Sequence, residues 1–250
     1  MANNIKPIKT KHVLIIFLVT LIPILIGVYL IIPSIMNKGV PFFIAYLICF
    51  QTIPFVFIFA LALVLYKKEG NPMDWKSFKT RMRLKFNGKI FLAALILLVL
   101  GIASYLVLQA ITALLSQTQL FSPPSWLGPD IHPLKVSNAG EFMGMALKGA
   151  WWAPLVYLIG WFFNIFGEEL LFRGYLMPRM ELSYGSKACL VNSACWWTWH
   201  MFWRWQLIAL FPFIFFLPFI AQKTKSTVPG LVAHGTMNFI AIIKIVLTVI

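Results

Sequence analysis

The sequence has very little negative charge. Only 7 of its 250 residues are Asp or Glu, and the charged residues together make up 11% of the chain. Soluble domains carry roughly a quarter charged residues. Because 60% of the residues are hydrophobic and several apolar runs approach the ~20 residues that span a bilayer, an ordinary soluble domain is excluded. The composition predicts an all-α fold, a polytopic transmembrane helical bundle.

Cysteine is scarce as well. The three cysteines, Cys49, Cys189 and Cys195, all lie in apolar segments. An odd number without metal-ligand spacing excludes a disulfide framework and gives no sign of a cysteine-based zinc cluster. The zinc motif H-E-x-x-H is also absent. We expect the three cysteines to be packing residues.

Seven apolar segments divide the chain. Their approximate bounds are 12–35, 41–66, 90–115, 149–172, 188–203, 206–221 and 228–250. They predict three regions, of which 1–115 is an N-terminal three-span region with a basic cytoplasmic loop. An outer loop at 116–148, expected to be irregular and without chemistry, precedes a core at 149–250.

Basic residues set the orientation of these spans. A net charge of +14 could indicate nucleic-acid binding, but the lysines and arginines lie in the loops between apolar segments, as in membrane proteins. With the N-terminus inside, sixteen basic residues fall inside and five outside. The five outer ones are Lys38, Lys135, Lys148, Arg204 and Lys244. The bias predicts a multi-pass protein of the cell membrane with its C-terminus outside and no nucleic-acid partner.

Two carboxylates lie inside an apolar segment, in the sequence F-G-E-E-L-L-F-R-G. Ionisable residues within a membrane are costly and by default functional. Glu169 and Arg173 are spaced i, i+4 and can pair, whereas Glu168 points about 100° away. We infer that Arg173 compensates Glu169 and leaves Glu168 for another task. The alternative is an ion pair that only holds helices together.

Two histidines also lie in apolar segments. His234 and Asn238 share a helix face at i, i+4, and His200 lies in C-W-W-T-W-H-M-F-W-R-W. The tryptophans around His200 are interpreted as an interfacial belt with Arg204, although they could instead line a site. One glutamate and one histidine can activate a water for peptide hydrolysis. A second histidine and an amide N–H can stabilise the oxyanion.

These motifs resemble the CPBP family, the intramembrane CAAX-type proteases and bacteriocin-processing or self-immunity proteins. E-E-L-L-F-R matches its E-E-x-x-x-R motif, and residues 234–238 match H-x-x-x-N. His200 matches F-x-x-x-H in position and order, with Trp196 in place of phenylalanine. The resemblance covers roughly residue 151 to the C-terminus, and the bacterial style of the motifs indicates a bacterial plasma membrane.

The resemblance implies an intramembrane endopeptidase acting on a membrane-associated or lipidated protein or peptide. Glu168 and His200 would activate water, His234 and Asn238 would form the oxyanion hole, and Glu169 and Arg173 would support the site. No cofactor is expected. The alternative is zinc, with Glu168, His200 and His234 as ligands.

Two other functions remain open from the sequence. A non-catalytic membrane immunity or peptide-binding protein would not depend on Glu168 or His200. A proton-coupled transporter could use Glu168 and the histidines as a relay, although no internal repeat supports it. At 1.5 Å per residue, Glu168 falls toward the inner leaflet and His200 nearer the middle. A buried start to the fifth helix, or a re-entrant segment, would bring them together.

Overall fold

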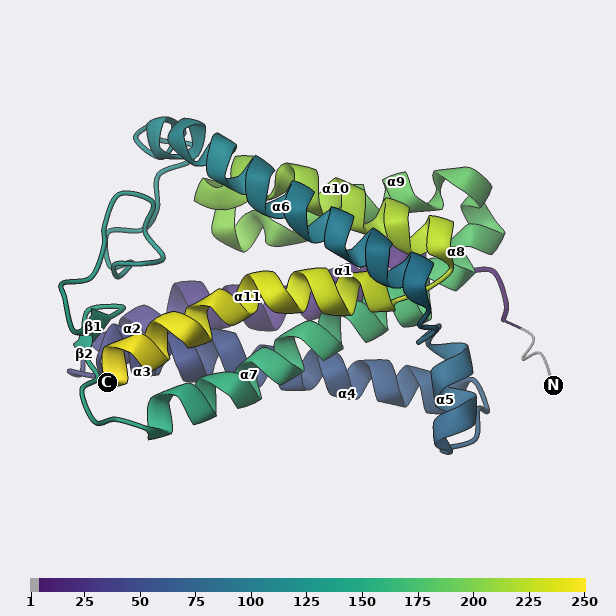
Figure 1. The fold of residues 1–250 in the computed structure, drawn as a ribbon, viewed down its shortest axis with the longest axis horizontal. Helices are drawn as coiled ribbons and strands as arrows, with labels where there is room; N and C mark the ends of the chain where they lie inside the picture. Colours follow the sequence, from purple (N-terminus) through teal and green to yellow (C-terminus); the bar gives the residue numbers. More distant parts are fainter. Residues whose placement is uncertain (1–4) are drawn as a thin grey trace.

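Helices make up most of the computed structural model, which describes residues 5–250 (Figure 1). In the N-terminal region the elements are α1 (Thr10–Ile26), η1 (Gly27–Ile31), α2 (Ile32–Met36), α3 (Phe42–Tyr46), η2 (Leu47–Thr52), α4 (Ile53–Lys68), α5 (Trp75–Arg81) and α6 (Gly88–Leu115). The remaining elements are β1 (Glu141–Phe142), β2 (Met145–Ala146), α7 (Trp152–Glu168), η3 (Glu169–Leu176), α8 (Met177–Tyr184), η4 (Gly185–Lys187), α9 (Ala188–Trp199), η5 (His200–Gln206), α10 (Leu207–Thr224) and α11 (Val228–Val249).

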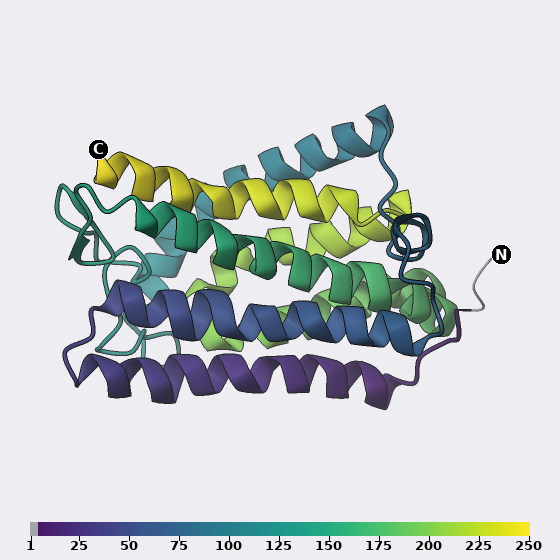
Figure 2. The same cartoon turned by 90° about the horizontal axis from the view of Figure 1, so that it is seen from below.

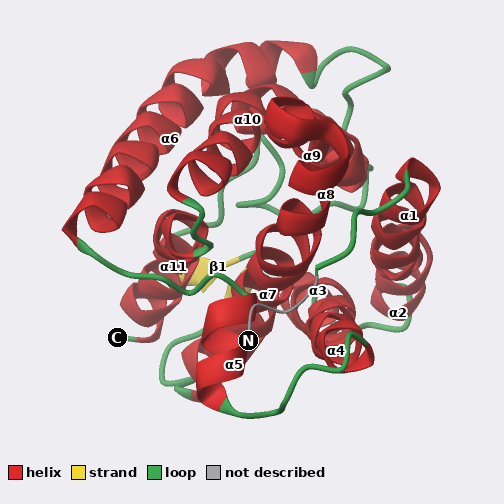
Figure 3. Cartoon of the chain, turned by 90° about the vertical axis from the view of Figure 1, so that its right-hand side faces the viewer, coloured by secondary structure: helices red, strands yellow, loops and turns green. Residues whose placement is uncertain are grey.

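The long helices form a closed ring. In the order α6, α10, α9, α1, α4, α7 and α11, each helix packs against the next, and α11 packs back against α6. Figure 3 shows this ring from one end, and Figure 2 shows α1, α4, α7 and α11 side by side. Helices satisfy their own backbone hydrogen bonds, which a membrane interior requires. The all-α prediction is confirmed.

Five continuous helical stretches among the described residues are long and apolar enough to cross a membrane. The fourth, Trp152–Thr224, contains three of the predicted segments in one run. Many leucine and isoleucine side chains on the outward faces of α1, α6 and α11 are exposed, which is expected of surfaces that contact lipid. The protein is therefore a multi-pass membrane protein.

The sequence suggested that the fourth segment ends at residue 172, but in the structure its helix continues further. After the 17 residues of α7, the π-helical η3 and then α8 each add 8 residues, so the helix continues to Tyr184. Glu168, the last residue of α7, is thus the middle residue of a 33-residue rod (17 + 8 + 8), not a residue near its inner end. A polar run such as M-P-R-M-E-L lowers the hydropathy without ending the helix.

The fifth predicted segment is also different from a simple span. α9 has only 12 residues and continues into the 3₁₀-helical η5, where Trp203 is non-helical (φ −118°, ψ 46°) and turns the chain into α10. His200 lies at this turn, twelve residues after the start of α9. Both Glu168 and His200 therefore lie near mid-depth, which removes the mismatch expected from the sequence.

The outer loop is more ordered than predicted. β1 and β2 pair antiparallel through a tight turn in which Met143 and Gly144 both have positive φ, the geometry of a type I′ hairpin turn. The Asp130 carboxylate accepts a hydrogen bond from the Met143 N–H at 2.8 Å. Phe142 is buried and its ring packs edge-on against Phe43 at 5.6 Å. This loop covers the outer end of the ring.

A cluster of charges closes the inner end. The Glu69 carboxylate accepts hydrogen bonds from Arg81 Nε at 2.6 Å and Arg179 Nε at 2.8 Å, which ties α4, α5 and α8 together. Arg81 also donates to the Gly174 carbonyl oxygen at 2.9 Å. Burial alone would raise the pKa of Glu69, but the bonds from the two arginines and Asn71 outweigh it and hold the pKa below its usual range.

Candidate active site

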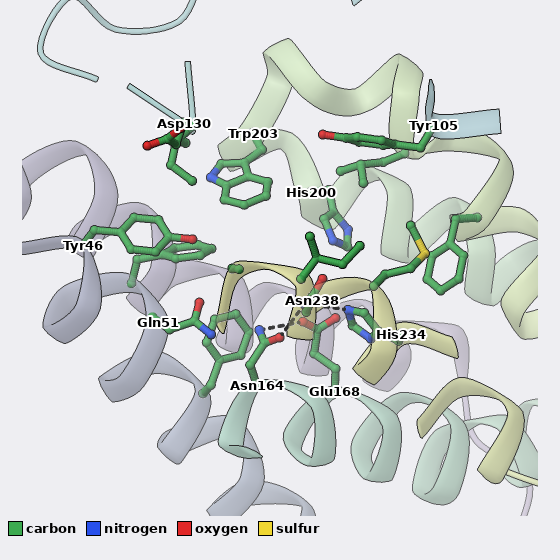
Figure 4. A pocket seen from close by; sticks show the side chains of 18 of the residues that line it. Tyr46, Gln51, Tyr105, Asp130, Asn164, Glu168, His200, Trp203, His234 and Asn238 are labelled. Atoms are coloured by element: carbon green, nitrogen blue, oxygen red, sulfur yellow. Dashed lines mark hydrogen bonds between the residues drawn. The ribbon is translucent and has the colours of Figure 1, made fainter. Parts of the chain in front are cut away.

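A cavity of about 460 Å³ lies inside the helix ring. Glu168, His200, His234 and Asn238, the four residues expected to be catalytic, all line it. They come from α7, the α9–η5 junction and α11. In Figure 4 their side chains face a common space, so the structure brings together residues that lie up to 70 positions apart in the sequence (238 − 168).

Glu168 is held by two hydrogen bonds. Its Oε2 accepts from Trp196 Nε1 at 2.8 Å, and its Oε1 accepts from Asn164 Nδ2 at 3.3 Å. Asn164 is one turn earlier on α7, so it shares a face with Glu168. Glu168 is therefore fixed in orientation, with lone pairs left to accept from a water.

The orientation of His200 is set by its own helix. His200 Nδ1 lies 2.8 Å from the Trp196 carbonyl oxygen. A carbonyl oxygen can only accept, so Nδ1 carries the proton and donates. In the neutral ring, Nε2 then keeps its lone pair. Both the side chain and the carbonyl of Trp196 are thus used to orient the residues expected to act on water.

His234 and Asn238 extend the same network. Asn238 Nδ2 donates to Asn164 Oδ1 at 3.1 Å and lies 3.3 Å from His234 Nε2. His234 Nδ1 lies 3.1 Å from Glu169 Oε1, an acceptor, so Nδ1 is the donor. The neutral ring then accepts the Asn238 N–H at Nε2. One chain of hydrogen bonds connects Glu169 through α11 to Glu168.

Glu169 lies behind this network. It is fully buried, does not line the cavity, and pairs with Arg173 at 3.3 Å, as the i, i+4 spacing predicts. The Arg173 guanidinium also lies over the Trp196 ring, with Cζ 3.6 Å from the centroid, a cation–π contact. Gly230 makes room for Glu169, because a Cβ there would lie 2.0 Å from Glu169 Oε2.

The expectation of an interfacial tryptophan belt is wrong for three of the five tryptophans near His200. Trp196, Trp199 and Trp205 are only 1% exposed. Trp196 and Trp203 line the cavity, and Arg204 donates to the Ser122 carbonyl oxygen instead of pairing with them. The segment is rich in tryptophan because large aromatic side chains fill the ring interior and shape the site.

Comparison with known families agrees with the motifs. Residues 150–240 match the family described as type II CAAX prenyl endopeptidase Rce1-like. This stretch is similar to an Rce1-like domain. It contains all six residues expected to form the site, and the family is one of membrane proteases. No curated protein and no solved structure matches the chain significantly. The resemblance inferred from the sequence is thereby confirmed at the level of the family.

The donor set of the Rce1-like domain does not fit a zinc site made by Glu168, His200 and His234. Both ring nitrogens of His234 have protein partners, so only Glu168 and His200 have unused lone pairs directed at one space. Within residues 5–250, no group of three His, Cys, Asp or Glu side chains has the arrangement to hold a metal ion. Structural and catalytic zinc sites have at least three protein ligands.

Two contributors to the site were missed in the sequence. Asn164 lies four residues before Glu168, a spacing that could have indicated a contact. Asp130 belongs to the outer loop, to which no chemistry was assigned, yet it lines the outer part of the cavity together with Phe142 and Met143 (Figure 4). No local pattern indicates that a loop at 116–148 reaches the space above Glu168.

Proposed function

We propose that the protein is an intramembrane endopeptidase that hydrolyses a peptide bond with a water activated by Glu168 and His200. The substrate is a membrane-associated or lipidated protein or peptide. The observation that carries this proposal is the arrangement of Glu168 and His200. Both line one cavity, both are oriented through Trp196, and each keeps a lone pair for a water. A general base must lie within hydrogen-bonding distance of the proton that it takes, and a water between these two residues would meet that condition.

In the first step a water donates one hydrogen bond to Glu168 and one to His200 Nε2. Its oxygen lone pair then attacks the carbonyl carbon of the scissile peptide bond. One O–H bond breaks, and its proton passes to one of these two residues as the C–O bond forms. The hydrogen bonds from Asn164 and Trp196 already hold the Glu168 carboxylate in position, so no entropy is lost in ordering it when the water binds.

The tetrahedral intermediate carries its negative charge on the former carbonyl oxygen. In the resting arrangement both N–H groups of Asn238 point to protein acceptors, Asn164 Oδ1 and His234 Nε2. Before the attack, His234 takes a proton at Nε2 from water in the cavity and keeps it throughout the reaction, so this nitrogen becomes a donor and Asn238 is released. One proton thus supplies two donors for the oxyanion, and Glu169 stabilises the imidazolium through Nδ1.

In the last step the intermediate collapses. The proton taken from the water passes to the leaving nitrogen and the C–N bond breaks, which gives a carboxylic acid and an amine. The proton of the acid then passes to the amine, and the products leave as a carboxylate and an ammonium. No metal is assigned to any step, because the donor set offers two free ligands rather than three. We therefore expect cleavage to continue in the presence of a chelator.

The test uses purified protein and a peptide library analysed by mass spectrometry, with and without chelator. Glu168→Gln and His200→Ala should each lower the cleavage rate about 10²–10⁴-fold, while the melting temperature stays within a few degrees. Glu141→Gln in the outer loop and His12→Ala at the membrane edge are the matched controls and should keep the wild-type rate. Wild-type rates in the Glu168 or His200 variants would refute the proposal and favour the non-catalytic immunity or peptide-binding alternative.

A further inference from the structure

The cavity lies mainly in the outer half of the helix ring. On α6, which runs outward from residue 88 to 115, the cavity is lined at 102–106. On α11, which runs outward from 228 to 249, it is lined from His234 to Lys244. On the second stretch, which runs inward from 42 to 68, it is lined at 46–55. These helices therefore place most of the cavity between mid-depth and the outer end, and on α11 it reaches inward to His234.

The inner half is filled with side chains. Met82, Met177 and Met180 are at most 1% exposed, and the Thr227 hydroxyl donates to the Met82 carbonyl oxygen at 2.7 Å. The charge cluster around Glu69 lies outside this plug. A second cavity of about 460 Å³ lies at the inner end beside Glu69 and Arg179, but none of the four expected catalytic residues lines it.

The ring opens sideways between α6 and α11. The two helices meet at Gly101, where a Cβ would lie 2.7 Å from Phe213 and 3.1 Å from Met237. Beyond this point they diverge toward their outer ends (Figure 1). Leu106 on α6 is 67% exposed and Ile240 on α11 is 45% exposed, and both line the cavity. Side chains that are exposed on the membrane-facing surface and also line the cavity mark an opening toward lipid.

The rim of this opening carries few charges. Lys244 lines the outer end of the cavity and is exposed, and it makes no ion pair with any described residue. The rest of the mouth is lined mainly by apolar side chains, together with Tyr105. Such an entrance suits a peptide with an apolar anchor that stays in the outer leaflet while its polar part reaches the water above it.

On the basis of the proposed function, we infer that substrate enters from the outer half of the bilayer, between α6 and α11. The substrate class is a peptide anchored in the outer leaflet, whose scissile bond reaches Glu168 from the extracytoplasmic side. Leu106 and Ile240 form the two sides of the entrance. Soluble cytoplasmic peptides and peptides anchored in the inner leaflet have no comparable route.

The first experiment measures from which side cleavage occurs. The probe is a palmitoylated fluorogenic peptide with the sequence cleaved in the library experiment and a charged segment that prevents it from crossing the bilayer. It is added to right-side-out and to inverted membrane vesicles containing equal amounts of protein. We expect cleavage at least tenfold faster in right-side-out vesicles. Faster cleavage in inverted vesicles would overturn the inference while leaving the proposed function intact.

The second experiment obstructs the entrance with larger side chains. Leu106→Trp and Ile240→Trp should each lower kcat/KM for the palmitoylated probe at least fivefold. The matched controls are Val107→Trp and Ile243→Trp, because these neighbours are as exposed, at 72% and 49%, but do not line the cavity. The controls should stay within twofold of wild type. Equal effects in both pairs would overturn the assignment of the entrance.

A third readout requires no catalysis. In a chain without the native cysteines, Ala241→Cys lines the cavity, and Lys187→Cys lies in the inner loop. A membrane-impermeant anionic thiosulfonate should modify Ala241→Cys only from outside, at a rate that the palmitoylated peptide lowers, and Lys187→Cys only from inside. Labelling of Ala241→Cys from the inner side would overturn the inference. If the labelling is as expected but no peptide is cleaved, the entrance would stand and the proposed function would be wrong.

Discussion

Trp196 links three groups of the site through different parts of one residue. Its indole N–H donates to Glu168, its carbonyl oxygen accepts from His200, and its ring lies against the Arg173 guanidinium. The family motif usually has phenylalanine here, which can provide the carbonyl and a ring but no N–H. The hydrogen bond to Glu168 is thus an addition that this chain makes to the motif.

Substitution of Trp196 tests the value of that hydrogen bond. Trp196→Phe keeps the carbonyl and a ring, and leaves Glu168 with Asn164 as its donor. We expect kcat to fall about tenfold, which corresponds to a loss of ~1.4 kcal/mol in transition-state stabilisation. Trp199→Phe is the control, because its equally buried indole donates to Thr20 instead. A similar fall in both variants would show that packing, not the bond to Glu168, matters.

Any side chain introduced at Gly230 would collide directly with Glu169. Gly230→Ala forces Glu169 away from α11, or α11 away from α7, and disturbs the contact with His234. We expect a loss of about 1–3 kcal/mol in unfolding free energy together with a loss of cleavage. A Cβ at Gly235 would lie 3.3 Å from its nearest neighbour, Trp161 Cζ2, so Gly235→Ala should be milder. Thermal unfolding in detergent, followed by tryptophan fluorescence, compares the two.

The sequence predicted contacts within a helix better than contacts between helices. The pairs Glu169–Arg173 and His234–Asn238 follow from i, i+4 spacing, and both are present. The contact between Trp196 and Glu168 depends on where the helix ring places α9 relative to α7, which no local spacing encodes. This is why the tryptophans were assigned to the membrane surface although three of them are buried.

At the scale of elements, the rod formed by α7, η3 and α8 decides where the site lies. The apolar run in the sequence ends at about residue 172, whereas the helix ends at Tyr184. A rod of 33 residues is about 50 Å long, longer than the ~30 Å hydrocarbon core, so its inner end reaches polar surroundings. The π-helical turn begins at Glu169, next to the site residue Glu168, and π-helical turns often occur at functional sites.

The charge cluster at the inner end should make stability depend on pH. The pKa of Glu69 is lowered in the folded protein, so its contribution is present above the unfolded pKa and is lost as the pH falls through the folded value. Glu69→Gln leaves Arg81 buried without its anion, and should cost about 3 kcal/mol near pH 7. The difference from wild type should vanish well below pH 4.

The measurement is the melting temperature of both proteins in detergent between pH 3 and 8. Glu141→Gln is the control, because Glu141 makes no ion pair with any described residue and its hydrogen bonds come from Asn138. A destabilisation of Glu69→Gln that stays constant down to pH 3 would contradict an ionised Glu69 as the source of the effect.

For the whole molecule, the structure gathers at one end the loops that the charge distribution assigned to the inner side. The basic loops lie at one end of the ring, together with α5 and the described N-terminal residues, and the outer loop and C-terminus lie at the other (Figure 1). The positive-inside bias could therefore be read from the sequence. The order of the helices in the ring could not be read from the sequence. It depends on which apolar faces pack together, and these helices are apolar on most of their faces.

The orientation predicts which positions react with reagents added to intact cells. In a cysteine-free background, Val136→Cys in the outer loop should react with an impermeant maleimide in intact cells. Ser186→Cys, next to the start of α9, should react only after permeabilisation. The opposite result would invert the topology and assign the cavity to the cytoplasmic side. Labelling is quantified by the shift in electrophoretic mobility after reaction with a polyethylene-glycol maleimide.

The methionine plug beneath the site bears on the permeability of the membrane. Hydrolysis needs water deep in the bilayer, and a water-filled passage through the ring would dissipate the proton gradient of the cell. Here buried methionines lie on the inner side of the cavity that holds Glu168. Entry from the outer half alone, as we infer, would let a cell hold many copies of the protein in its membrane without electrical leakage.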